Sequence, residues 1–202
     1  MMTVELLTEA PLAPPAGLGP YRRQDYDALP DQPRCELLFG RLYVMSSPTL
    51  VHQAMIIVLA RHFDDIAQGS GGLAYAAPLD VELADHSIVQ PDVIYLSAAR
   101  LGVARPHRMI GAPDLLVEIL SPATARRDRG EKLMLYAESG IREYWIADAK
   151  LRQIEFLVNE GGRFVVALPV DGTYRSQVLP EIHLDVVDLW RQVETRLPPK
   201  TA

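Results

Sequence analysis

The stretch LLVEIL, residues 115–120, sets one carboxylate among five apolar residues. A short apolar run bounded by proline residues predicts a buried strand that is covered on both faces. An unpaired carboxylate is costly to bury, so such a group is normally paired, protonated or bound to a metal. Glu118 is therefore a candidate functional residue. The structural alternatives are an ion pair with Arg126 or Arg129, or an edge strand that leaves Glu118 exposed to water.

A strand, a helix and a second strand are predicted from this stretch onward. The helical pattern runs from about Thr124 to Ser139, with Gly140 in the position of a C-terminal cap, and the next strand covers residues 144–147. Together these elements make a βαβ-like unit. Further strands are expected at 79–83, 88–96, 154–158 and 164–168, a hairpin at 37–45 with Gly40-Arg41 as its turn, and helices at 48–68 and 185–196. The predicted fold class is α/β, a mixed central sheet flanked by helices.

The composition is that of one globular domain, with 202 residues of which 49% are hydrophobic and 23% charged. Proline and glycine within residues 1–20 predict a flexible N-terminal arm outside the core. A single cysteine excludes an internal disulfide and favours a reduced, cytoplasmic location. No apolar run approaches the ~20 residues that cross a bilayer, so no membrane partner is expected. The net charge of −6 argues against strong non-specific attraction to nucleic acid, so any such contact must be local.

A second carboxylate, Asp92, lies within the apolar run 88–96, directly after Pro91. Two acids on two core strands can converge at one end of a sheet. Such a pair suits a hard cation such as Mg²⁺ or Mn²⁺, particularly when substrate phosphate completes the coordination shell. Taken alone, Asp92 fits better as an ordinary aspartate in a turn or at the start of a strand, but the two acids together favour the metal site.

Lys132 and Glu36 are further candidates. Lys132 lies one turn before Tyr136 on the predicted helix, where it could reach the buried face and polarise water or stabilise phosphoryl charge. The alternative is an exposed Lys132 that pairs with Asp128 four residues earlier. Glu36, just before the hairpin's apolar run, could be a third carboxylate, although a surface position fits its pattern better.

Other polar groups have weaker patterns. His52 and Gln53, near the start of the first long helix, could face the same cleft, but a cap or surface role is the more common one, and neither is assigned a catalytic role. The basic clusters at 105–108 and 126–129 could meet phosphates or be solvated. No G-x-S-x-G elbow, phosphate-binding loop or H-E-x-x-H motif is present, which argues against serine hydrolases, P-loop enzymes and zinc peptidases.

Several motifs in order resemble one family. They are ELLFG at 36–40, HQ at 52–53, QPDV at 90–93, GAPDLLVEILSP at 111–122, RRDRGEK at 126–132 and GIREYWI at 140–146. This set is similar to the Uma-two family of restriction endonucleases within the PD-(D/E)XK nuclease superfamily. The resemblance implies a restriction-endonuclease-like fold, as a single nuclease domain over residues 21–197, with a divalent metal at the edge of the sheet.

The resemblance also assigns roles to residues. Asp92 would be the first metal ligand, Glu118 the second and Glu36 an auxiliary group. The superfamily's lysine position, two residues after Glu118, is occupied by Leu120, and Lys132 from the following helix takes the lysine role. Asp114 imitates the superfamily's Pro-Asp, but it starts the strand that carries Glu118, so Asp92, on a preceding strand, is preferred.

The expected function is a divalent-metal-dependent endonuclease that hydrolyses phosphodiester bonds in DNA, with Mg²⁺ or Mn²⁺ on Asp92 and Glu118. The alternative is a non-catalytic binding or assembly module that keeps the nuclease fold, motivated by Leu120 in the lysine position and by the net charge of −6. A homodimer is plausible in either case, because cleavage of both strands of a duplex suits two-fold symmetry.

Overall fold

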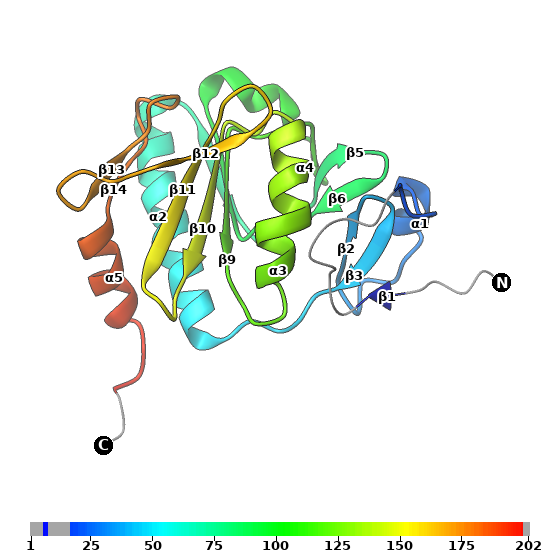
Figure 1. The fold of residues 1–202 in the computed structure, drawn as a ribbon, viewed down its shortest axis with the longest axis horizontal. Helices are drawn as coiled ribbons and strands as arrows, with labels where there is room; N and C mark the ends of the chain where they lie inside the picture. Colours follow the sequence, from blue (N-terminus) through cyan, green and yellow to red (C-terminus); the bar gives the residue numbers. More distant parts are fainter. Residues whose placement is uncertain (1–5, 8–16, 200–202) are drawn as a thin grey trace.

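The central element of the computed structural model is a six-stranded mixed sheet (Figure 1). The model describes residues 6–7 and 17–199. β9 runs parallel to β10, and every other neighbouring pair in this sheet is antiparallel. In spatial order the strands are β12 (Phe164–Ala167), β11 (Gln153–Asn159), β10 (Glu143–Asp148), β9 (Leu115–Ile119), β7 (Val93–Leu96) and β4 (Leu73–Ala76).

A second sheet lies beside the first, at the right of Figure 1. Its strands, in spatial order, are β1 (Leu6–Leu7), β3 (Arg41–Val44), β2 (Cys35–Leu38), β6 (Ser87–Val89), β5 (Val81–Ala84) and β8 (Met109–Ile110). A separate small hairpin joins β13 (Thr173–Arg175) to β14 (His183–Asp185). Most of the predicted N-terminal arm, residues 1–5 and 8–16, lies outside the described residues.

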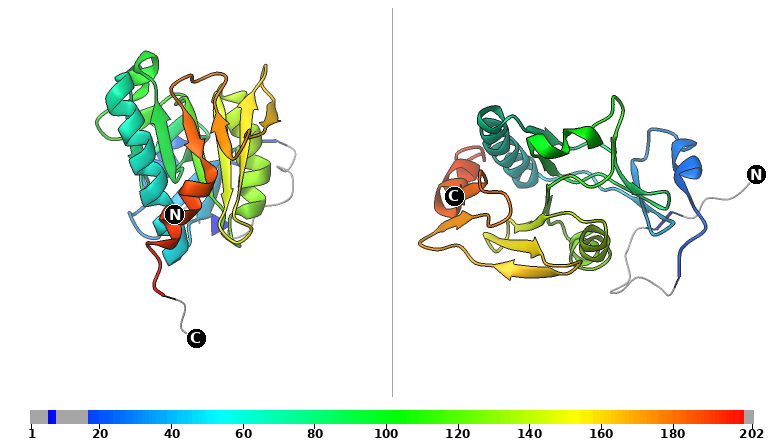
Figure 2. Two further views of the ribbon diagram at one scale, coloured as in Figure 1. Left: turned by 90° about the vertical axis from the view of Figure 1, so that its left-hand side faces the viewer. Right: turned by 90° about the horizontal axis from the view of Figure 1, so that it is seen from above.

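Helices cover both faces of the central sheet (Figure 2). On one face lie α2 (Leu50–Ser70) and α5 (Val186–Glu194), which pack on Leu115, Val117 and Ile119 of β9. On the other face lie α3 (Ala125–Arg127), the π-helical turn η2 (Asp128–Lys132) and α4 (Leu133–Glu138). The remaining helices are α1 (Arg23–Asp27) and the 3₁₀ helix η1 (Ala98–Val103).

Side-chain alternation along β9 decides where its carboxylate lies. Leu116 belongs to the apolar cluster that contains Leu135 and Tyr136 of α4, whereas Val117 belongs to the cluster beneath α2. Because neighbouring strand residues face opposite sides, Glu118 points toward the helix that follows its own strand. The predicted α/β class with a restriction-endonuclease-like mixed sheet is confirmed.

Two predicted elements need correction. The run 88–96 is not one strand: β6 ends at Val89, β7 begins at Val93, and the two belong to different sheets. Pro91 lacks a backbone donor and interrupts the ladder between them. The hairpin turn lies at Phe39-Gly40 rather than Gly40-Arg41, since Phe39 and Gly40 have φ of 46° and 76°, as a two-residue turn of this kind requires.

The two long helices also differ from expectation in detail. The first long helix, predicted from residue 48, begins instead at Leu50, after the N-terminal cap Thr49, whose hydroxyl accepts from the His52 amide. The helical segment after β9 has the predicted extent, but a π-helical turn interrupts it at residues 128–132. Throughout the described part of the chain, no helix combines the length and apolar character needed to cross a membrane.

Candidate active site

Lys132 is the centre of a buried charge cluster. Its side chain, in the π-helical turn, is 2% exposed. The ammonium nitrogen lies 2.7 Å from Glu36 Oε1, 2.8 Å from Glu118 Oε1 and 3.7 Å from Asp128 Oδ1. One cation therefore serves three carboxylates that come from both sheets and from the helix between them.

Two of the three carboxylates, Glu36 and Glu118, have further hydrogen-bond donors. Glu36, on β2, accepts hydrogen bonds from the Gln90 amide at 2.9 Å and from Arg127 Nη1 at 3.3 Å. Glu118, on β9, accepts from the Tyr136 hydroxyl at 2.7 Å. These contacts fix the carboxylates in place, which is the condition for a preorganised site.

Asp92 approaches Glu118 across the sheet. It directly precedes β7, where Val93 is paired with Val117, so Asp92 reaches the level of Glu118. Its Oδ2 accepts from the Ile119 amide at 2.7 Å, and its Oδ1 lies 2.9 Å from His52 Nε2. Asp92 is thus held between the end of β9 and the first turn of α2.

Asp92, Glu118, Lys132 and His52 line one cavity of about 400 Å³. The walls come from the start of α2 and the loop into it, from the segment after β9, and from Ala77-Pro78. The structure therefore brings together the two predicted metal ligands and the predicted lysine. Glu36 lies directly behind them and is fully buried.

Burial and neighbouring charges shift the pKa values of this cluster in different directions. Burial raises the pKa of Glu118 well above its usual value; Lys132 acts to lower it, while Asp128, Asp92 and Glu36 add to the rise. Although burial acts to raise it, the pKa of Glu36 is lowered, because Lys132 and Arg127 both stabilise its charged form. The pKa of Lys132 is raised despite its burial, since Glu118, Glu36 and Asp128 surround it.

Asp128 is the carboxylate of the cluster whose charge has the least support. Both of its carboxylate oxygens are buried, and neither makes a hydrogen bond within the described residues. Burial raises its pKa to about 6, while Lys132 acts in the opposite direction. The cluster thus holds more acid than its cations can neutralise at neutral pH.

The donor set fits a divalent cation. Lys132 and Arg127 are the two buried cations among the described residues, and they are shared by Glu36, Glu118 and Asp128. Asp92 adds a fourth carboxylate beside His52, and an excess of carboxylate in a cavity attracts a hard metal ion. Within residues 6–7 and 17–199, no three acidic, histidine or cysteine side chains are arranged to hold a metal. Asp92 and Glu118 would therefore share the ion with water and substrate oxygens, the usual mode for Mg²⁺.

The structure contradicts several alternatives considered from the sequence. Glu36 is not a surface residue, because its exposure is 0%. Lys132 does approach Asp128 but is not exposed. Glu118 is neither wet nor paired with Arg126 or Arg129, because its partner is Lys132.

Asp114 is separate from this site, as expected. It lies at the opposite end of β9, fully buried, where it accepts from the Ser97 amide at 2.8 Å. Arg100 and Arg142 pair with it at 3.4 and 3.2 Å. These contacts give Asp114 a structural role in anchoring the start of β9.

Three arginines of the two basic clusters are paired with carboxylates of the protein and are therefore not free to bind phosphate. Arg127 is buried over the Tyr43 ring, with its guanidinium carbon 4.3 Å from the ring centroid, and it pairs with Glu36. Arg129 pairs with Glu155, and Arg108 with Asp27 and Glu82. Asp128 and Arg127 belong to the site although the sequence did not predict it. They lie in a run of charged residues, and such a run is normally exposed to solvent.

Comparisons with known proteins identify a family and a similar fold. The model of the Uma2 family, described as "Putative restriction endonuclease", matches residues 23–187. The fold is similar to that of a putative nuclease belonging to DUF820 from Anabaena variabilis ATCC 29413, with a TM-score of 0.70 and 19% identity over 86% of this chain and 99% of that one. No curated protein gives a significant match.

Proposed function

Given that this chain belongs to the Uma2 family, we propose that it is a divalent-metal-dependent endonuclease that hydrolyses phosphodiester bonds in DNA. The family and the fold support nuclease activity in general. The observation that carries the proposal is the meeting of Asp92, Glu118 and Lys132 in one cavity.

Asp92 and Glu118 are the residues proposed to hold Mg²⁺ or Mn²⁺. A metal bound there supplies an activated water and polarises the phosphoryl oxygen. The Ile119 amide and His52 orient Asp92, while Tyr136 and Lys132 orient Glu118. Both carboxylates are thus held in one geometry before substrate enters.

Lys132 is proposed to stabilise the negative charge that develops on the reacting phosphate. It occupies the lysine role that Leu120 leaves open. Because Glu36 and Asp128 help to keep its ammonium charged and in place, a phosphate in the cavity meets a fixed positive charge in surroundings with little water. Such preorganised charge is worth more than the same charge in bulk solvent.

The test is cleavage of supercoiled plasmid and of single-stranded circles by the purified protein with Mn²⁺, Mg²⁺ or EDTA. We expect metal-dependent nicking that falls at least about 100-fold in Glu118→Gln. Glu160→Gln, which changes an exposed glutamate far along the chain in the β11–β12 turn, should cleave like the wild type. Equal activity in the wild type and Glu118→Gln would mean that the activity belongs to a contaminant or to another site.

One observation favours the alternative, a nuclease-fold module without catalysis. The Lys132 ammonium is already surrounded by three carboxylates. In that case the protein would cleave none of these substrates and would bind no Mn²⁺ at millimolar concentration. Tight Mn²⁺ binding that Asp92→Asn abolishes would contradict the module.

A homodimer is proposed as the cleaving form for duplex DNA, since two sites related by two-fold symmetry reach both strands. Light scattering coupled to size exclusion gives the oligomeric state directly. A protein that remains monomeric with duplex bound would contradict this part of the proposal.

A further inference from the structure

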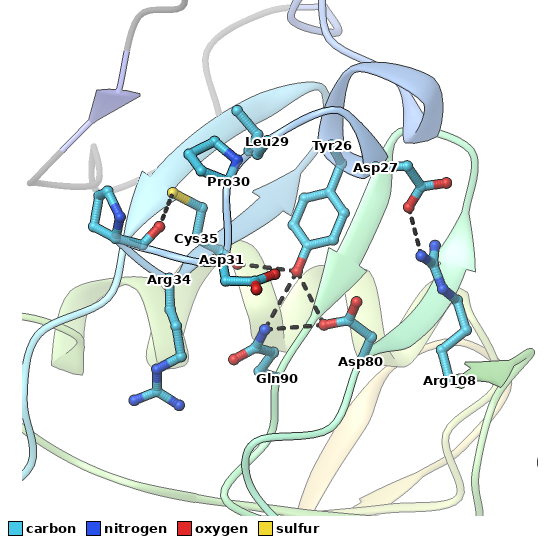
Figure 3. A pocket seen from close by; sticks show the side chains of 11 residues that line it. Tyr26, Asp27, Leu29, Pro30, Asp31, Arg34, Cys35, Asp80, Gln90 and Arg108 are labelled. Atoms are coloured by element: carbon cyan, nitrogen blue, oxygen red, sulfur yellow. Dashed lines mark hydrogen bonds and ion pairs between the residues drawn. The ribbon is translucent and has the colours of Figure 1, made fainter. Parts of the chain in front are cut away.

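A second cavity, of about 330 Å³, is lined by Gln90, which lies two residues before Asp92 in the sequence (Figure 3). It is built by α1 and the loop up to Cys35, together with Asp80, Gln90 and Arg108. Its volume is in the range of small-molecule pockets, about 300–1,000 Å³. None of the residues assigned to catalysis above lines it.

Gln90, one of the residues that line this cavity, has an unsatisfied acceptor. The residue is 9% exposed, and its Nε2 donates to Asp80 Oδ1 at 2.9 Å and to the Tyr26 hydroxyl at 3.3 Å. Because an ionised carboxylate only accepts, the amide nitrogen must face Asp80. The remaining Oε1 is buried and has no hydrogen-bond partner in the described part of the chain. Buried polar atoms are normally paired, so this oxygen is suited to a donor from a ligand.

The other open groups of the cavity are also acceptors. Asp80 Oδ1 receives both Tyr26 and Gln90, and no contact within the described residues uses its Oδ2. The exposed Asp31 carboxylate likewise has no hydrogen-bond or ion-pair partner there. Asp27, by contrast, is taken by Arg108. The cavity thus favours a ligand edge rich in N–H donors.

Tyr26 supports this arrangement as a fixed donor. Burial and the adjacent Asp80 raise the pKa of Tyr26 well above its usual value, so its hydroxyl stays protonated and donates to Asp80. Its ring stands beside Gln90 and Asp80 in Figure 3. The hydroxyl therefore does not supply an open acceptor, and Asp80 and Gln90 remain the groups that a ligand would meet.

Arg34 links this cavity to the catalytic one. It lines both cavities, and no side chain within residues 6–7 and 17–199 pairs with its guanidinium. Gln90, in the wall of one cavity, and Asp92, in the wall of the other, are two residues apart, a span of at most about 7 Å. A strand whose phosphate contacts Arg34 could therefore place a base in one cavity and a neighbouring phosphodiester in the other.

We propose that the cavity lined by Asp31, Asp80 and Gln90 binds a guanine base of the nucleic-acid strand, with Arg34 holding the linking phosphate. This inference rests on the proposed nuclease function. Guanine presents two adjacent donors, N1–H and N2–H₂, for the open acceptors of the cavity, which are Asp80 Oδ2 and the Asp31 carboxylate. Thymine offers a single ring N–H, and adenine and cytosine each offer one amino group, so guanine fits the open acceptors best.

The first experiment measures binding without cleavage. The full chain in EDTA is titrated calorimetrically with dGMP, dAMP, dCMP and TMP. We expect dGMP to bind about 5- to 100-fold more tightly than TMP, the discrimination typical of a bidentate base contact. Equal affinity for the four nucleotides, or no dGMP binding at millimolar concentration, would overturn the proposal.

Two variants distinguish recognition of the base by Asp80 from recognition of the phosphate by Arg34. Asp80→Asn keeps an oxygen for Tyr26 and Gln90 but replaces the open acceptor by a donor, so it should abolish the preference for dGMP. Arg34→Gln should weaken all four nucleotides alike. The matched controls, Asp85→Asn and Arg61→Gln, change exposed residues outside both cavities and should bind like the wild type. An unchanged dGMP preference in Asp80→Asn would overturn the assignment of the base.

A third comparison separates a strand from a free nucleotide. A thymidine 12-mer with one central guanosine should bind more tightly than dGMP, because the strand also reaches the catalytic cavity. Tight dGMP binding with no gain for the 12-mer would overturn the strand as ligand. The two proposals fail separately: selective dGMP binding without any cleavage contradicts the nuclease, whereas cleavage without guanine preference contradicts this pocket.

Discussion

Lys132 is the shared cation of three buried carboxylates. Replacing it by methionine keeps most of the volume but leaves Glu36, Glu118 and Asp128 buried without their shared cation. Removing one partner of a buried ion pair typically costs about 3–5 kcal/mol. We expect Lys132→Met to lower the free energy of unfolding in urea by this amount, while Lys150→Met, in an exposed turn, stays near the wild type.

The double variant Lys132→Met/Glu118→Gln checks the cause of that loss. Glutamine removes one of the charges that the lysine had balanced, so the double variant should be more stable than Lys132→Met alone. If the two losses simply add, the lysine stabilises the fold by packing rather than by charge.

Asp128 gives a prediction in which the sign depends on pH. Its pKa is raised to about 6 in the folded chain, because burial penalises the charged form, whereas an unfolded aspartate titrates near 3.9. The folded state therefore loses stability as pH rises from about 4 through 6. Asp128→Asn should match the wild type at pH 4 and be more stable at pH 7, by about 1–3 kcal/mol.

Thermal unfolding between pH 4 and pH 8 measures this difference. Asp148→Asn serves as the control, since Asp148 caps a turn near the surface through the amides of Lys150 and Leu151. A stability gain in Asp128→Asn that is the same at every pH would show that the aspartate is not titrating in this range.

At the scale of single elements, the end of α2 contains two glycines with opposite requirements. Gly69 lies inside the helix with open space around it, so Gly69→Ala should stabilise the protein by about 0.5–1 kcal/mol. Gly71 caps the helix in the left-handed conformation, at φ 74°. An added Cβ would meet no clash there, but alanine disfavours this backbone conformation, so Gly71→Ala should destabilise the protein by about 1 kcal/mol. Urea unfolding of the pair tests the signs, and a gain in both variants would contradict the cap.

Elements with strong local patterns could be predicted from the sequence. The apolar periodicity of α2 and the apolar run of β9 identify both elements, because each buries one or both of its faces in the core. The split at residues 90–92 could not be predicted in the same way. Gln90, Pro91 and Asp92 interrupt the apolar run, and the proline argues against one continuous strand, but only the packing of the structure shows that β6 and β7 belong to different sheets.

The burial of a highly charged run explains why the site was predicted only in part. The spacing of Glu118, Asp92 and Lys132 in family motifs pointed to these residues, and the structure places all three in one cavity. In the run 126–132, however, Arg127, Asp128, Glu131 and Lys132 are all buried. Their spacing puts them on one side of the helical segment, but charged side chains are seldom buried, so a run of charged residues on one face is normally interpreted as solvent-exposed.

For the whole molecule, metal binding should appear as added stability. A ligand at 100 times its dissociation constant stabilises the folded state by about 2.7 kcal/mol, and for a chain of this size each kcal/mol raises Tm by about 2–4 °C. We expect saturating Mn²⁺ to raise the Tm of the wild type and of Glu160→Gln by about 5–10 °C. Glu118→Gln and Asp92→Asn should show no rise, and an equal rise in all four proteins would place the metal elsewhere.

The cluster around Lys132 also bears on how the chain is made. Glu36 and Arg127, which pair in it, are 91 positions apart in the sequence, and contacts of such separation form late because a long loop must first close. A nascent chain that has emerged only as far as β9 carries Asp92 and Glu118 but no lysine to complete the centre. The proposed nuclease therefore stays inactive during its synthesis, until the segment through residue 132 has emerged and docked.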